Sequence, residues 1–566
     1  MNNKDISILL KDTAKLLELH GANPFQIRHY TNAALWLEKL RQPVADLAPE
    51  ALSEPEGVAT STRKFLQEIN ETGTLQRWEE LHAATPQGVR EMLSLRGIGP
   101  KKVGVLWKEL GIESLGALQR ACEEGMVAQL SGFGAKTQAT IQESLAFKAE
   151  QVGKFHYATA LPYATALETQ LQEAFPEFPI SLTGALRRKM EVVTQVEVLV
   201  GTDRVAPVMQ WLDRQPTLQT GRREDGAWHG QFVELELPLT VSCCPPDLFH
   251  RQLLLSTGTT AHLALQVQED KTLGEIINSM TALNSEADAY AQVGLPYIPP
   301  ELREGHIELA WAKEKGAPSL LKMQDLRGVF HNHTTYSDGK HSLEDMARYC
   351  RELGYEYIGI TDHSQSAYYA GGLQLDAIRQ QHEEIDRLNA QLAPFKIFKG
   401  IESDVLGDGQ LDYDTATLDR FNFVVASVHA GVNMSRTQAT ERVIKAIQNP
   451  YTTILGHLTN RLLLRREGFP IDHKAVIDAC AEYGVVIEVN SNPWRLELDW
   501  RWIDYALSKN VWISINPDAH DKESIQKMYY GVCVARKGGL TPARTFNALS
   551  GEAVTRYLQR RKHQTI

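Results

Sequence analysis

The sequence predicts a multidomain protein with an all-α N-terminal part, a central α/β part and a C-terminal barrel of parallel β/α units. At 566 residues the chain is too long for one core, and the usual domain size indicates three or four units. The first 150 residues or so carry helix formers at amphipathic spacing, as in ISILLKDTAKLLELHG, without strand-like alternation. From about residue 325, short apolar runs such as YIGIT, FNFVVASV and GVVIEVN alternate with helical stretches.

Changes in pattern along the chain divide it into four expected domains. A helical small domain takes residues 1–85, and a second helical domain takes residues 86–153. Strands such as QVEVLVG and QFVELELPLTVS appear among helices in residues 154–315, a region that closes with the Pro-rich GLPYIPPELREG. The barrel takes residues 325–566.

Composition limits the functional classes. With 43% hydrophobic and 23% charged residues, no basic N-terminal region followed by an apolar run and no long apolar stretch, we expect a cytoplasmic protein without a membrane partner. The six cysteines form no CxxC pair, which indicates reduced thiols. The net charge of -11 excludes a globally basic nucleic-acid binder, so any contact with DNA must be local. The oligomeric state is left open, with a monomer favoured.

Two Gly-apolar-Gly turns precede helices in the second helical domain. Glycines let the backbone turn tightly, so that the amides of the next helix point at a phosphate. Glycine caps between packed helices are the alternative for a single copy. Two copies beside lysines favour helix-hairpin-helix binding of a DNA backbone. The candidate DNA-binding residues are Gly97, Gly99, Lys101, Lys102, Gly132, Gly134 and Lys136.

Metal-binding residue types follow the strands of the predicted barrel. His331 and His333 stand two apart at a strand end, so both rings face the same side. The other candidates also follow strands, at the face where parallel barrels build their sites. They are Asp338, His363, Glu402, His429, His457, Asp518 and His520. A core histidine explains any one of these residues, but not all of them on one rim.

Such a cluster has a predictable chemistry. Imidazoles and carboxylates this close would repel one another without cations, so two or three divalent ions are expected. Mixed nitrogen and oxygen ligands suit Mn, Zn or Fe better than Mg. The expected reaction is metal-assisted hydrolysis of a phosphoester. Arg461, Arg465 and Arg495 are candidates to bind the phosphate, although a structural ion pair explains each of them equally well.

These motifs resemble those of the polymerase and histidinol phosphatase (PHP) domain. The stretches that carry the resemblance are HNH at 331–333, TDH at 361–363, GIESD at 400–404, SVHAG, GH at 456–457 and DAH at 518–520. The resemblance implies that all nine residues above are metal ligands. Glu402, His429 and Asp518 are the candidate catalytic residues, and Glu402 is the candidate for a carboxylate that bridges two ions.

The whole chain is similar to bacterial family X DNA polymerases with a C-terminal PHP domain. GANPFQIRHYTNAA resembles their small domain, TGALRR their palm, and STGTTAH the region leading into PHP. The resemblance implies helix-hairpin-helix domains, a nucleotidyltransferase-like palm and thumb, and a distorted (β/α) barrel of the PHP type.

The palm motif departs from that family, which carries GSxRR, an aspartate pair spaced D-x-D and a third aspartate on a neighbouring strand. The corresponding residues here are Ala185, Arg187, Arg188, Gln195, Glu197 and Thr240, with Glu234 or Glu236 as alternatives for the third aspartate. Two Mg²⁺ ions need several anionic oxygens close together, so catalytic Mg²⁺ is not expected at the palm. The two arginines still offer charge to a triphosphate.

The small domain departs from the family as well. Ala59 replaces the second glycine of its first turn, and Phe65 stands where the lysine of a sugar-phosphate lyase would fall, with Lys64 beside it. Lyase activity is therefore not expected.

Together these features predict a metal-dependent DNA phosphoesterase on a polymerase-derived scaffold that has lost templated synthesis. A 3′-to-5′ exonuclease or an abasic-site endonuclease in DNA repair fits best, with DNA ends, gaps or abasic sites as the partner. A working family X polymerase that uses Glu197 is one alternative. A small-molecule PHP phosphatase is another, for which the first 300 residues or so would be surplus. The filled ligand set disfavours a non-catalytic DNA-binding protein.

Overall fold

A computed structural model describes residues 1, 3–39, 44, 60–224, 226–268, 270–281, 283–315 and 319–563. The chain forms two compact units, Met1–Val152 and Gly153–Ile566. Among the described residues, none of the helices has both the length and the apolar character needed to cross a membrane. Six free cysteines are present.

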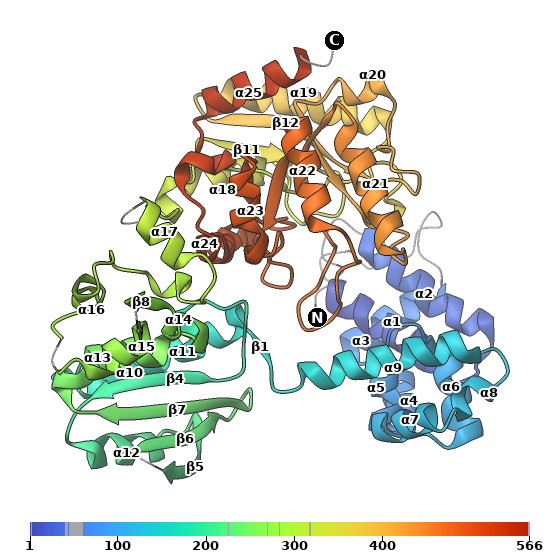
Figure 1. Cartoon of the computed structure of the whole chain (residues 1–566). Coiled ribbons are helices and arrows are strands. Elements are labelled where there is room, and N and C mark those ends of the chain that lie inside the picture. Colours follow the sequence, from blue (N-terminus) through green and yellow to red (C-terminus); the bar gives the residue numbers. More distant parts are fainter. Residues whose placement is uncertain are drawn as a thin grey trace. The chain divides into compact units, whose positions relative to one another are not determined.

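The first unit is helical over its described residues (Figure 1). The amphipathic first helix supplies two cores: Ile6 and Leu10 pack in one, Leu16 and Leu17 in the other. The helices are α1 (Asn3–His20), α2 (Pro24–Lys39), α3 (Thr60–Thr72), α4 (Gln76–Ala84), α5 (Gln87–Met92), α6 (Pro100–Leu110), α7 (Leu115–Glu123), α8 (Met126–Gln129) and α9 (Gly134–Gln151).

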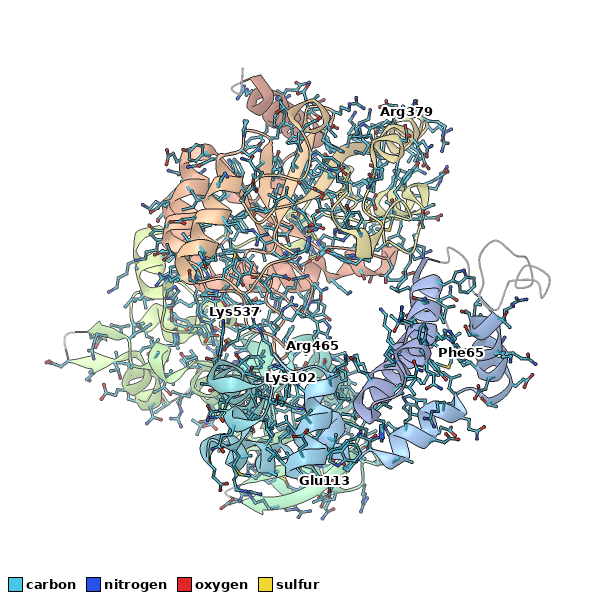
Figure 2. All side chains as sticks on the ribbon, turned by 90° about the vertical axis from the view of Figure 1, so that its right-hand side faces the viewer. Phe65, Lys102, Glu113, Arg379, Arg465 and Lys537 are labelled. Carbon is cyan, nitrogen blue, oxygen red and sulfur yellow. The ribbon has the colours of Figure 1, made fainter. Side chains whose placement is uncertain are left out.

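Phe65 lies on α3, where its ring stacks on Tyr30 at 4.2 Å between centroids (Figure 2). The position that would hold a lyase lysine is thus occupied by a packing residue. Ala59 lies outside the described residues.

The second unit begins with a mixed α/β region around a five-stranded sheet of order β2-β4-β7-β6-β5, which we call the palm after the expected domain. Only β4 and β7 pair in parallel. The strands are β2 (Ile180–Leu182), β4 (Val196–Gly201), β5 (Leu218–Glu224), β6 (Ala227–Phe232) and β7 (Leu237–Cys244), and β1 (Phe155–His156) pairs separately with β3 (Val192–Val193). Helices α10 (Tyr157–Ala174), α11 (Gly184–Arg187) and α12 (Val205–Asp213) accompany the sheet.

A mainly helical region with its own core follows the palm, and we call it the thumb after the expected domain. Leu254, Leu273 and Tyr290 are fully buried in that core. Its elements are α13 (Phe249–Thr257), α14 (Thr260–Leu263), β8 (Gln266–Gln268), β9 (Lys271–Thr272), α15 (Leu273–Ser279), α16 (Glu286–Gln292) and α17 (Glu308–Lys315).

The C-terminal barrel confirms the fold class predicted from the sequence. Seven parallel strands stand in chain order, and a parallel bridge between Asn332 and Ala519 links the ends of the first and last. The strands are β10 (Gly328–Val329), β11 (Tyr357–Ile360), β12 (Lys396–Asp404), β13 (Phe423–Ser427), β14 (Thr452–Leu455), β15 (Val486–Asn490) and β16 (Ile513–Asn516). Larger helices around them are α18 (Leu343–Glu352), α19 (Leu375–Leu392), α21 (Arg436–Gln448), α22 (His473–Tyr483), α24 (Met528–Lys537) and α25 (Gly551–His563).

One end of the barrel is filled with aromatic side chains. Phe330 contacts the rings of Tyr357, Phe423 and Phe546 at centroid distances of 5.1 to 5.4 Å, and all four are buried. Val554 and Leu558 of α25 belong to the same cluster, which we call the aromatic plug. Side chains alternate along a strand, so Glu402 points to the same side of β12 as Phe398, two layers further on. The polar layer of the barrel therefore lies beyond the plug.

Candidate metal centre

The structure brings all nine predicted ligands together at the C-terminal ends of the barrel strands. They form four overlapping groups whose ligand atoms lie within 4.8 Å of one another. The groups are His333, Asp338, His363 and His520; His331, Glu402 and His457; His331, His333 and Asp518; and His363, Glu402 and His429. Shared members imply neighbouring ion positions rather than separate sites.

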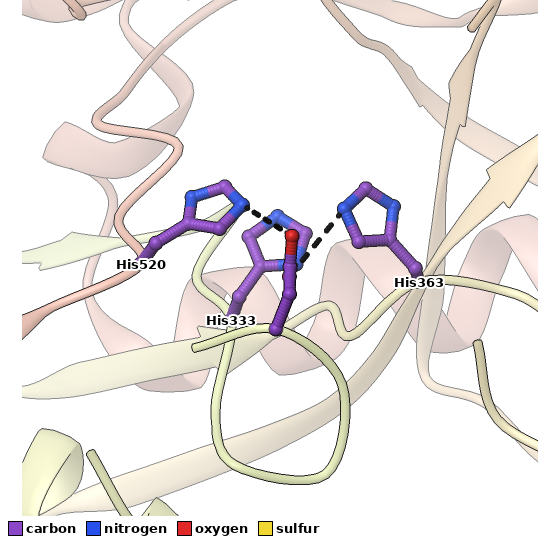
Figure 3. Close-up of side chains that lie close together, drawn as sticks. His333, His363 and His520 are labelled. Atoms are coloured by element: carbon purple, nitrogen blue, oxygen red, sulfur yellow. Dashed lines mark ion pairs between the residues drawn. The ribbon is translucent and has the colours of Figure 1, made fainter. Parts of the chain in front are cut away.

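Figure 3 shows the imidazoles of His333, His363 and His520 close together, and the carboxylate of Asp338 belongs to the same group. One carboxylate oxygen is 3.3 Å from Nε2 of His520, and the other is 3.6 Å from Nε2 of His363. The His333 and His520 rings stack at 4.2 Å. These residues come from three different strand ends, so only the folded barrel assembles the group.

Glu402 occupies the centre of the cluster. Its Oε1 atom is 3.1 Å from Nε2 of both His331 and His457, and 3.3 Å from Nε2 of His429. Its Oε2 atom faces the other way, 2.9 Å from Nδ1 of His363. A carboxylate whose two oxygens face different sets of imidazoles has the geometry needed to bridge two ions.

Two further carboxylates orient the ligands, and both escaped prediction. Oε2 of Glu488 lies 2.6 Å from Nδ1 of His331 and accepts a hydrogen bond from Asn516. Asp404 lies 2.5 Å from Nδ1 of His429. Partners of this kind fix the tautomer and angle of a ligand imidazole. Glu488 had a detectable signal, because it interrupts the otherwise apolar run GVVIEV of a buried strand.

The buried cluster has strongly perturbed protonation. Burial raises the pKa of Glu402, but His429 and His331 hold it well below its ordinary value. Burial, together with His520 and His363, lowers the pKa of His333 to about 4. Burial alone would lower the pKa of His429, but Glu402 and Asp404 raise it to about 10. Without metal ions, protonated imidazoles and the guanidinium of Arg495 neutralise the carboxylates, and this is a role that metal ions fill in such sites.

The donor atoms fit divalent ions. Both ring nitrogens of His333 are buried without a hydrogen-bond partner among the described residues. Nδ1 of His363 and Oε2 of Glu402 lie close together, yet neither makes a hydrogen bond of acceptable geometry. Native proteins rarely leave buried polar atoms without a hydrogen-bond partner, unless an ion or a water molecule binds them. Nitrogen and carboxylate donors together suit Mn, Zn or Fe.

The three candidate phosphate-binding arginines differ in their surroundings. Nε of Arg495 is 3.5 Å from Oδ2 of Asp518, so this guanidinium reaches the cluster. Arg461 pairs with Asp499 at 2.6 Å and donates to the carbonyls of Arg495 and Leu496, which makes it a support for the loop. Arg465 is exposed.

In the palm, Thr240 stands directly beside Glu197. The two residues are partners across the parallel strands β4 and β7. Glu234 and Glu236 lie in the turn before β7, whose pairing with β4 begins at Leu239, so the alternative alignment is not supported. Gln195 precedes β4 and is half-buried. No second carboxylate therefore accompanies Glu197 at these predicted positions.

Glu197 is itself engaged. Its carboxylate lies against Gly184 and accepts a hydrogen bond from the amide of Ala185. A Cβ atom at Gly184, whose φ is +62°, would collide with this carboxylate. Burial raises the pKa of Glu197, against the effects of Arg188 and the Ala185 amide.

The palm arginines are also paired. Arg187 donates from two nitrogens to Glu286 at 2.8 and 2.7 Å, which is a bidentate ion pair. Arg188 lies 3.1 Å from Glu304, which also binds the buried Lys537 of the barrel at 2.5 Å (Figure 2). The positive charges of Arg187 and Arg188, which were expected to bind a triphosphate, are therefore paired with carboxylates of the protein itself.

In the two glycine turns of the first unit, the backbone has a positive φ at three of the four glycines. Gly97, Gly132 and Gly134 have φ of +84°, +81° and +75°. Gly99 has φ -97° as the N-cap of α6, and a Cβ there would meet nothing within 4 Å, so the turn itself does not require glycine there.

The lysines beside these turns differ as well. Lys102 lies over the Phe133 ring at 5.2 Å and donates to Thr137, so it links the two turns. Lys101 and Lys136 are exposed.

Comparisons with known proteins agree with this geometry. A model of the PHP domain matches residues 330–492, a helix-hairpin-helix domain matches 1–75, and a SAM-like helix-hairpin-helix tandem matches 89–146. The DNA polymerase/3′-5′ exonuclease PolX of Bacillus subtilis is 33% identical over 99% of this chain and 100% of its own. A probable phosphatase of Thermoanaerobacter is 27% identical over 41% of this chain and 95% of its own.

Proposed function

The chain belongs to the PolX family, and on that premise we propose that it is a metal-dependent 3′-5′ exonuclease acting on DNA in repair, with a palm that no longer polymerises. The observation that carries the proposal is the convergence of nine ligands at one end of the barrel, beside a palm with a single, engaged carboxylate. We include two or three Mn, Zn or Fe ions as the cofactor and DNA ends, gaps or abasic sites as the substrate.

The residues of the barrel support hydrolysis of a phosphodiester. Bound divalent ions supply an activated water and neutralise charge on the phosphoryl oxygens. The imidazole of His333 is neutral, because burial and the neighbouring His520 lower its pKa to about 4, so one of its ring nitrogens is free for coordination. Arg495, next to Asp518, is placed to pair with a phosphate oxygen. Glu488 and Asp404 keep the imidazoles of His331 and His429 in a fixed orientation.

The palm supports the loss of synthesis. Two-metal phosphoryl transfer needs carboxylates that hold both ions, and Glu197 is the single one at the expected positions. Its hydrogen bond to Ala185 competes with coordination of Mg²⁺. Arg187 and Arg188 are held by Glu286 and Glu304.

One assay tests both halves of the proposal. Labelled single-stranded and gapped DNA are incubated with Mn²⁺, with or without nucleotides. The wild type and Glu197→Ala should degrade DNA equally, whereas His333→Ala and Asp518→Ala should be inactive. Gapped-primer extension by His333→Ala is the sharpest measurement, because degradation cannot hide its product. Extension that disappears when Glu197→Ala is added would show a working polymerase.

A phosphatase is the second candidate, since probable phosphatases match 41% of this chain over 95% of their own length. Turnover of a small phosphomonoester that exceeds turnover of DNA would favour it. Release of cleaved product at an internal abasic site, in a strand with blocked ends, would instead favour an endonuclease.

A further inference from the structure

Exposed aromatic side chains flank the metal centre. Tyr368 and Tyr369 are 82% and 71% exposed, and Trp494 is 48% exposed. The tyrosines follow β11 in the loop that carries His363, and Trp494 follows β15 beside Arg495. Both loops leave the C-terminal ends of barrel strands, so the three rings share the rim with the ligands. Large apolar rings left in water at a functional rim indicate a ligand that covers them.

Tyr369 is tied to the cluster. Its ring centroid lies 6.1 Å from that of His363 and 6.5 Å from that of His429. The carboxylates of Asp404, Glu402 and Asp338, and the guanidinium of Arg495, act electrostatically on its hydroxyl. The tyrosine therefore borders the space above the ligands while most of its surface stays exposed.

Trp494 lies in the loop that follows β15, on another side of the barrel from Tyr369. Three strands separate β11 from β15 in the sheet order, and the neighbouring Arg495 reaches Asp518. The indole packs on the ring of His156, with 4.2 Å between the ring centroids, and Nε2 of His156 forms a hydrogen bond with the carbonyl of Leu463. The Trp494 carbonyl accepts from the amide of Leu463. The indole is thus held in place before any ligand arrives.

We propose that Tyr369 and Trp494 stack on the bases of a single DNA strand whose end phosphodiester lies at the metal centre. This inference rests on the proposed function and specifies its substrate as an unpaired strand end. Bases offer flat π faces, and stacking on aromatic side chains binds single strands without sequence preference. Arg495 supplies the neighbouring positive charge for the backbone.

The test compares two substrates and five proteins. One substrate is a short single-stranded oligonucleotide, and the other has the same backbone without bases at its 3′ end. In wild type, removing the bases should raise KM by about 5- to 150-fold, as expected for one stacked base. Trp494→Ala and Tyr369→Ala should each raise KM for the normal substrate, leave kcat nearly unchanged and lose part of the discrimination. Tyr483→Ala, an exposed tyrosine at the end of α22, is the matched control and should behave as wild type.

The outcomes separate the two proposals. Trp494→Phe should retain most of the discrimination, which distinguishes stacking from a packing defect. A wild type that cleaves both substrates with equal KM overturns the inference alone, and so do alanine variants that discriminate like wild type. A wild type that cleaves neither substrate with Mn²⁺ overturns the proposed function and the inference with it.

Discussion

Glu488 shows how one buried carboxylate serves the metal centre without being among the predicted ligands. It is fully buried, faces His331 and receives hydrogen bonds from the amides of His457 and Asn516. Burial raises its pKa, but His331 and His457 hold it below the ordinary value, so it stays ionised. A fixed anion behind an imidazole strengthens that ligand.

We expect Glu488→Gln to weaken metal binding about 10- to 100-fold, because the amide keeps the shape but removes the charge. Metal affinity is measured by competition with a chelator. Glu482→Gln, at an exposed position on α22, is the matched control and should bind as wild type. Equal affinities in all three proteins would contradict the role given to Glu488.

Glu286 joins the palm to the thumb and makes stability depend on pH. Burial raises its pKa, but Arg187 and Arg303 lower it to about 2 from 4.5. Because the pKa of Glu286 is lower in the folded than in the unfolded protein, its ionised form stabilises the folded state. This stabilisation is complete above the unfolded pKa and is lost as pH falls from about 4.5 to about 2. The shift corresponds to about 3 kcal/mol.

We expect Glu286→Gln to be less stable than wild type at neutral pH, and the difference should shrink as pH falls below about 4.5. Urea unfolding at a series of pH values measures this difference. Glu224→Gln, at an exposed strand end, should show no such trend. A difference that stays constant down to about pH 3 would show that the ion pairs of Glu286 do not set the pH dependence.

The glycine turns belong to the elements that could be predicted only in part. The pattern Gly-apolar-Gly located both turns, but it treated all glycines alike. The structure requires positive φ at Gly97, Gly132 and Gly134, and not at Gly99. A sequence pattern shows where a turn falls, whereas the sign of φ depends on how the following helix packs.

We expect Gly97→Ala with Gly134→Ala to weaken DNA binding, because a Cβ is strained at both positions and meets the Thr140 side chain at the first. DNA affinity and hydrolysis of a small phosphodiester are measured together, and only affinity should change. Gly116→Ala, in open space on α7, is the control. Unchanged affinity in the folded double variant would mean that these turns do not bind DNA.

Most of the barrel and its ligands could be predicted, because each ligand lies in or just after the C-terminal part of an apolar strand and strand ends meet at one edge. His457 after TTIL is an example. The engagement of Arg187 by Glu286 could not be predicted, since 99 positions separate them and many carboxylates were available. Trp494 gave no signal either, because exposure depends on the final packing of its loop.

The molecule as a whole consists of two compact units, and the ligand cluster lies entirely in the second. Anything that binds the folded state alone stabilises the unit that contains its site. Metal removal is therefore a selective perturbation.

We expect a chelator to lower the unfolding temperature of the second unit and leave that of the first unchanged. At free metal about 100 times Kd the stabilisation is about 2.7 kcal/mol. Scanning calorimetry with and without chelator measures it, and elemental analysis should find two or three ions per chain, as in multinuclear sites. His333→Ala should respond less to the chelator. Identical transitions and no bound metal in the wild type would contradict a metal centre.

The aromatic plug has a kinetic consequence. Phe330, Phe423 and Phe546 fill the barrel behind the ligands, and α25 packs against them, so the end of the barrel opposite the ligands is occupied by side chains. Under the proposed function, a strand end enters and a freed nucleotide departs on the ligand side of the barrel. The freed nucleotide therefore has to diffuse out before the next phosphodiester linkage can reach the metal centre.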